Sequence, residues 1–80
     1  MTDAQARLLI YLLEDAKKTN CPPLQREMAA ALHVSVGRIQ KSLVALEREG
    51  FLKRGGQILP LRLAPREQII AALRIHGARL

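Results

Sequence analysis

The chain is 80 residues long, has a formal net charge of +6, and contains Tyr11 and Phe51 as its only aromatic residues. This length allows one small domain with an aliphatic core, and no apolar run approaches the roughly 18 residues that a membrane span requires. The single Cys21 cannot form an internal disulfide, and it shares no metal-ligand spacing with His33 or His76. We therefore expect a cytoplasmic protein without a membrane segment, a secretory signal, a metal or a cofactor.

A first helix is predicted to start at Asp3, because Thr2 and Gln5 have the spacing of a capping box. Leu8 and Leu12 lie on a side of this helix that is about 100° or more from its main apolar stripe. Either the C-terminal helix or a second subunit must cover these two leucines. The main stripe, which should enter the core, consists of Ala6, Leu9, Ile10, Leu13 and Ala16.

A short second helix is predicted over residues 24–32, after the paired prolines 22–23 have ended the first one. His33 follows at the point where the chain must turn before Ser35, a good N-cap residue. Histidine tolerates left-handed backbone geometry, so we interpret His33 as a turn residue rather than a catalytic or ligand residue. The predicted buried side of the second helix is Leu24, Met28, Ala29 and Leu32.

The stretch SVGRIQKSLVALEREG, residues 35–50, predicts a third helix that begins at its N-cap Ser35 and stops at Gly50. Its predicted core face is Val36, Ile39, Leu43 and Leu46. Residues 51–54 and 57–63 then predict two strands joined by a two-residue turn at Gly55 and Gly56. Pro60 places the second strand at an edge or marks a break in it.

A last helix is predicted to begin at Pro65 and to end near Gly77. The order of elements indicates a mainly α fold with a small β-hairpin, the winged helix-turn-helix. It has a three-helix core and a two-stranded wing in a domain of residues 1–63. An extra C-terminal helix in residues 64–80 either packs on this domain or dimerises. The short turn before Ser35 makes the second and third helices cross steeply, which leaves the outer face of the third free to enter a major groove.

The charge is concentrated in one part of the chain. Residues 1–34 hold four basic and four acidic side chains, whereas residues 35–80 hold nine basic and three acidic ones, which is the entire +6. Such asymmetry is typical of a surface that binds a polyanion, although a basic surface that only maintains solubility is an open alternative. The outer face of the third helix carries Gly37, Lys41, Val44 and Arg48, with Arg38 and Gln40 on its flanks.

These residue types suit contacts with duplex DNA. Arginine and lysine can bind guanine O6 and N7, and glutamine can bind adenine N6 and N7. Gly37 is interpreted as a position where a missing side chain lets the helix backbone approach the groove; the alternative is a glycine merely tolerated near a helix start. Predicted phosphate contacts are Gln25, Arg26, Ser35 and Ser42, with Lys53, Arg54 and Arg62 on the hairpin.

The run NCPPLQREMAAALHVSVGRIQKSLVALEREGFLKR, residues 20–54, resembles the DNA-binding domain of LexA-type repressors, and the likeness covers roughly residues 2–63. MarR-like and GntR-like regulators share the pattern of the third helix. The resemblance implies a transcription regulator whose third helix contacts the groove through Ser35, Arg38, Gln40 and Lys41. Leu24 stands where the family usually has a Thr or Ser cap. The self-cleaving peptidase domain of LexA repressors has no counterpart in these residues, so autocleavage is not implied.

The leading hypothesis is a sequence-specific, duplex-DNA-binding regulator, a repressor from a prokaryote, phage or plasmid. The alternative is a winged-helix adaptor or inhibitor of another regulator, which would bind its partner through the apolar C-terminal helix. An enzyme is not expected, because no nucleophile is paired with a base and no carboxylate pair has a recognisable spacing. A homodimer contact is predicted from Leu8, Leu12, Ile69, Ile70 and Leu73, and the competing hypothesis is that the last helix closes the core of its own chain.

Overall fold

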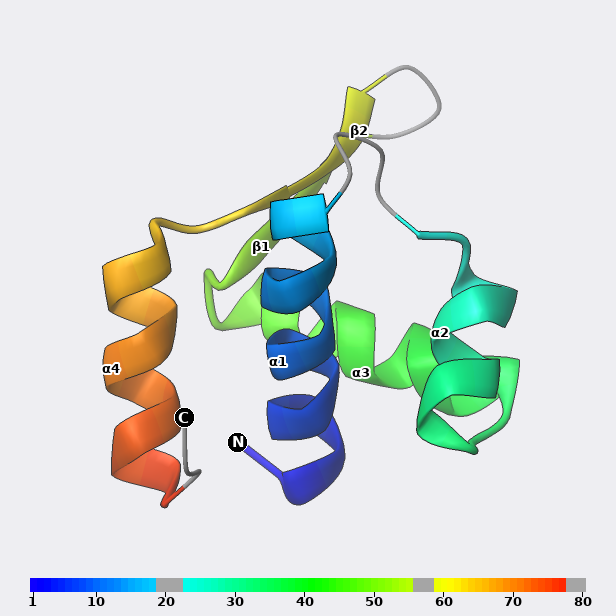
Figure 1. Ribbon diagram of the computed structural model, residues 1–80, viewed down its shortest axis with the longest axis horizontal. Coiled ribbons are helices and arrows are strands. Elements are labelled where there is room, and N and C mark those ends of the chain that lie inside the picture. The colour runs from blue at the N-terminus through cyan, green and yellow to red at the C-terminus, as the bar shows by residue number, and fades with distance from the viewer. Residues whose placement is uncertain (19–22, 56–58, 78–80) are drawn as a thin grey trace.

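The computed structural model describes residues 1–18, 23–55 and 59–77. Its elements are α1 (Asp3–Lys18), α2 (Gln25–Leu32), α3 (Val36–Arg48), β1 (Leu52–Gly55), β2 (Leu59–Leu63) and α4 (Arg66–His76). The two strands form one antiparallel hairpin. Helix α1 lies between α2 and α4, and α3 runs across it (Figure 1). The predicted winged helix-turn-helix, mainly α with a small hairpin, is therefore confirmed.

The capping box predicted at the start of α1 is present. The Thr2 N–H donates to Gln5 Oε1, and the Gln5 N–H donates to Thr2 Oγ1, both at 3.2 Å. In the predicted stripe, Ala6, Leu9 and Leu13 are buried and Ile10 is half-buried. Ala16 was predicted to enter the core, but it is exposed, because it lines an open hollow with Leu63 and Arg66 that no helix or strand of the described residues fills.

The second side of α1 is covered by α4 of the same chain. Leu8 and Leu12 are 0% and 2% exposed, and Ile69 and Leu73 of α4 are both fully buried in the same core. Ile70 is half-buried against this core. Leu8, Leu12, Ile69 and Leu73 therefore offer no surface to a second copy while α4 stays docked, whereas Ile70 remains partly exposed. The predicted dimer contact is corrected for these four residues, and the competing hypothesis, a helix that closes the core of its own chain, describes the arrangement found.

The ends of α1 and α4 are also joined by a polar contact. His76 Nε2, in the last turn of α4, lies 2.8 Å from Asp3 Oδ1, in the first turn of α1. With Ile69 and Leu73 buried, Ile75 is the exposed large apolar residue of α4, at 88%. The apolar surface that this helix offers to a partner thus consists mainly of Ile75, with exposed Ala71 and half-buried Ile70.

Helix α2 begins without a side-chain acceptor at its N-cap. Leu24 occupies that position and is 52% exposed, so its predicted place in the core is wrong. The cap position lies ahead of the first helical turn, outside the face formed by Met28 and Ala29, which are buried. The Leu24 N–H instead donates to Glu27 Oε1 at 3.4 Å. At the other end, His33 has φ 57° and ψ 43°, which confirms it as the left-handed turn residue.

Helix α3 has the predicted caps and most of the predicted core face. Ile39, Leu43 and Leu46 are at most 2% exposed, and Gly50 follows the helix with φ 83°. Val36 was also predicted to be buried, but it is 40% exposed. As the first residue of the helix, it lies one turn ahead of Ile39, beyond the elements that enclose the core.

The wing pairs Leu52 with Leu63, Lys53 with Arg62, and Gly55 with Leu59. Gly55 was predicted to be part of a two-residue turn, but it is the last residue of β1. The strand is one residue longer than predicted because Gly55 still pairs with Leu59. The connection falls on residues 56–58, outside the described residues. Between Lys53 and Gly55 the register shifts, so that two steps along β1 face three along β2. The shifted stretch of β2 contains residue 60, the proline predicted to mark a break.

Candidate nucleic-acid interface

The outer face of α3 is exposed to solvent. Ile39, Leu43 and Leu46 fix the opposite side of the helix in the core. The N-cap is set by Ser35, whose Oγ accepts the Arg38 N–H at 3.2 Å. No carboxylate occurs from residue 35 to residue 46. The exposed residues of this outer face are Gly37, Gln40, Lys41, Val44 and Arg48.

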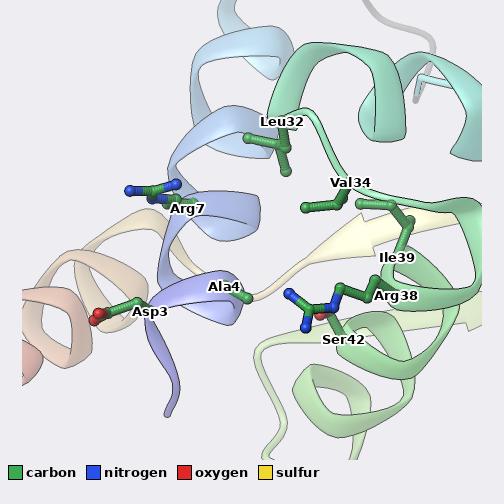
Figure 2. A pocket seen from close by; sticks show the side chains of 8 residues that line it. All are labelled: Asp3, Ala4, Arg7, Leu32, Val34, Arg38, Ile39 and Ser42. Atoms are coloured by element: carbon green, nitrogen blue, oxygen red, sulfur yellow. The ribbon is translucent and has the colours of Figure 1, made fainter.

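Arg38 lies apart from this group, although its backbone is on the same helix. Figure 2 shows its side chain extending from α3 toward Ala4 on the first turn of α1. It lies over a hollow of about 260 Å³. Ser42, half-buried, lines the same hollow and therefore lies on the flank of α3 that faces α1. The remaining lining residues are Asp3, Ala4, Arg7, Leu32, Val34 and Ile39.

Arg7 is a cation of this region that was not predicted from the sequence. Its exposed side chain lines the hollow from α1, with the guanidinium turned away from Arg38 (Figure 2). It belongs to residues 1–34, whose formal charges cancel, so the charge asymmetry gave no signal for it. Asp3, four residues earlier, is engaged by His76 at 2.8 Å. Arg7 therefore adds a positive charge on α1, from outside the basic part of the chain and directed away from α3.

The start of α2 contributes two of the predicted phosphate contacts. Arg26 is exposed and Gln25 is half-buried, and both lie in the first turn, where helix N–H groups without intrahelical partners favour an anion. Glu27 occupies the same turn. Its Oε1 accepts a hydrogen bond from the Leu24 N–H, so this carboxylate oxygen is used in capping α2.

The wing carries two cations directly opposite each other. Lys53 and Arg62 are cross-strand partners, and both side chains are exposed. Like charges at opposed positions of an antiparallel pair destabilise it, so this pairing is unfavourable for the free hairpin and becomes favourable beside an anion. Arg54 follows Lys53 in β1; its side chain lies outside the described part of the structure.

A comparison with protein families decides what this arrangement belongs to. The family model described as the LexA DNA binding domain matches residues 1–57, which is well over half of the chain. The chain belongs to this family. No curated protein matches it. Among the described residues, no helix is long and apolar enough to cross a membrane.

The LexA DNA binding domain spans α1, α2, α3 and β1 of this chain, and the match ends before β2 and α4. The predicted family is thereby confirmed for the part that contains the helix-turn-helix. Arg62, the second cation of the opposed pair on the wing, lies beyond the matched residues. So do Ile69 and Leu73, which close the core from α4.

Proposed function

We propose that this protein is a transcription regulator that binds specific sequences of duplex DNA and acts as a repressor. The proposal rests on one observation: a member of the LexA DNA binding domain family exposes, on the outer face of its third helix, cationic and amide side chains without a carboxylate in the first three turns. In a helix-turn-helix, this is the face that enters the major groove. In this proposal the protein acts by binding DNA and not by catalysis. It acts in the cytoplasm of a prokaryote and is encoded by the prokaryote, a phage or a plasmid.

Base recognition is assigned to the middle of this face. Lys41 suits guanine O6 and N7, and Gln40 suits adenine N6 and N7. Arg48 lies two turns further along the same face, where it suits the groove edge or a phosphate. Arg38 would have to turn out of the hollow beside α1 to contact a base, so Lys41 has the larger proposed role.

Phosphate contacts are assigned to residues that surround this face. The opposed Lys53 and Arg62 on the wing suit one backbone strand, because an anion between them removes their mutual repulsion. The first turns of α2 and α3 have backbone N–H groups without intrahelical partners, which suit phosphates of the other backbone strand. The complete proposed set is Gln25, Arg26, Ser35, Ser42, Lys53, Arg54 and Arg62.

Specific regulators commonly double their site by two-fold symmetry, and we propose the same for this protein when it is on its operator. A homodimer would have to use a surface other than Leu8, Leu12, Ile69 and Leu73, which are buried within one chain. Sedimentation with and without the operator tests this. A complex containing a single 8.9 kDa chain at saturating protein would contradict the dimer.

Selection of bound sequences from a random duplex pool tests the proposed function, followed by a salt titration on the selected site. We expect an enriched sequence and an affinity that falls steeply with salt, by about 0.9 in log K per phosphate contact for each tenfold increase. Lys53→Ala should reduce the steepness of that slope by about 0.9, the value expected for one phosphate contact. Arg74→Ala is the matched control: it also removes one exposed cation, but from α4. Absence of enrichment, or a slope that neither variant changes, would contradict the proposal.

A further inference from the structure

Two valines on α3 are partly exposed and lie outside the described core. Among the described residues, the large apolar side chains that remain exposed are Leu24, Val36, Val44 and Ile75. Val36 is 40% exposed and Val44 is 37% exposed. Neither belongs to the core cluster or to the partly buried residues packed against it. The core therefore does not account for an apolar residue at either position.

Helix formation does not account for Val44 either. Valine is restricted at χ1 within a helix and is a poorer helix former than alanine, lysine or glutamate. Val44 lies in the interior of α3, with exposed Lys41 and Arg48 one turn before and after it. A polar residue with a straight side chain would suit both the helix and the solvent better at this position. Contact with a partner outside the chain would account for the valine.

The two valines form one row with Gln40. Val36, Gln40 and Val44 are spaced by four residues, so successive members are about 6 Å apart in rise along the axis and are turned by about 40° around it. The row therefore runs from the edge of the core face at Val36 to the outer face at Val44. Successive bases of one DNA strand are separated by about 3.4 Å. Neighbours in this row thus span about two base steps. An amide that suits adenine stands between two apolar side chains.

The major groove presents one apolar group among its base edges, the 5-methyl of thymine, and apolar side chains contact it. Building on the proposed function, we propose that Val36 and Val44 recognise thymine methyl groups on either side of the base contacted by Gln40. The operator is then expected to contain thymine at one or both of these flanking positions. This recognition adds to the polar contacts of Lys41 and Gln40, which cannot distinguish thymine from uracil.

Replacing thymine with deoxyuridine in the selected duplex tests this directly, because the change removes only the methyl group. Burial of one such group contributes about 0.8 kcal/mol, so each contacted thymine should lose about fourfold in affinity when it becomes uracil. Val36→Ala and Val44→Ala should each bind the thymine duplex more weakly. Each variant should also become insensitive to the thymine-to-uracil change at the one position that its valine contacts. Ile75→Ala, an exposed apolar truncation on α4, should keep the whole penalty.

The outcomes separate this inference from the proposed function. A sequence-specific complex that ignores every thymine-to-uracil change, or in which both alanine variants retain the full penalty, would overturn the valine contacts and leave the regulator standing. Valine variants that leave DNA affinity intact but change the sedimentation of the free protein would assign the row to contact between copies, which also overturns it. A pool without any enriched sequence would reject both.

Discussion

The two sides of α3 differ in what determines their composition. On one side, Ile39, Leu43 and Leu46 are at most 2% exposed, and the core requires each of them to be apolar. On the other, Lys41 and Val44 are exposed, and Val44 does not belong to the described core, so the core does not fix the identity of either residue. Substitution should accordingly separate the two sides: the first should change stability and the second should change binding.

Leu46→Ala is the largest expected effect. Leu46 is fully buried, and truncating a buried leucine loses its transfer free energy and leaves a cavity, which costs about 2 to 5 kcal/mol of unfolding free energy. Urea unfolding followed by circular dichroism measures it. Leu46→Met is the control that retains volume, with an expected loss below about 1.5 kcal/mol. Equal stability of the two variants would show that this side of α3 is not tightly enclosed.

Lys41→Ala should show the opposite behaviour. We expect a loss of about 1 to 3 kcal/mol in binding free energy on the selected duplex, if the ammonium contacts a guanine, with unfolding unchanged. Titration of a labelled duplex gives the affinity, and Arg38→Ala tests the neighbouring cation that points toward α1. The expected loss is smaller for Arg38. Full affinity in the double variant would reject contact through this face of α3.

The elements of this fold were predictable because local signals define them. The Thr2 and Gln5 capping box, the histidine turn at residue 33 and the helix stop at Gly50 all occur as predicted. The apolar spacing also identified Ile39 and Leu43. Each of these features depends on residues within about a turn of one another, so the sequence alone carries it.

Predictions that depended on distant contacts were less successful. Periodicity identified apolar sides on α1 and α4, but not that Leu8 and Ile69 are buried in one core within the same chain. It also assigned Leu24 and Val36 to the core, since a helical wheel ignores where the packed elements end. The outer face of α3 was predictable because it lies opposite the apolar side of the helix, which the periodicity identifies. The direction of the Arg38 side chain was not, because it depends on α1.

Ser35 connects the stability of α3 with its proposed binding. Its Oγ accepts the Arg38 N–H at 3.2 Å, so Ser35→Ala should cost about 1 kcal/mol of unfolding free energy. Ser35→Asp restores a cap acceptor and should restore stability, but its charge should weaken binding by repelling the proposed phosphate. Thermal unfolding and duplex titration of both variants measure the two effects. An aspartate variant with unchanged affinity would place the phosphate away from Ser35.

Gly37 is expected to give the smallest effect on the fold. A Cβ at this position would meet only Ser35 Oγ, at 3.9 Å, so the free protein has room for a side chain. Gly37→Ala should therefore leave the unfolding free energy unchanged or raise it by up to about 1 kcal/mol.

Binding should respond in the other direction, because Gly37 is exposed on the outer face beside Lys41, where the missing side chain allows the helix backbone to approach the groove. Gly37→Ala should weaken binding, and Gly37→Leu should weaken it further as the added side chain separates helix from DNA. Stability and affinity measured on the same preparations distinguish this from misfolding. If both variants bind normally, glycine is only tolerated near the start of α3, and close approach of the backbone is not part of the contact. Recognition would then depend on Gln40, Lys41 and their neighbours alone.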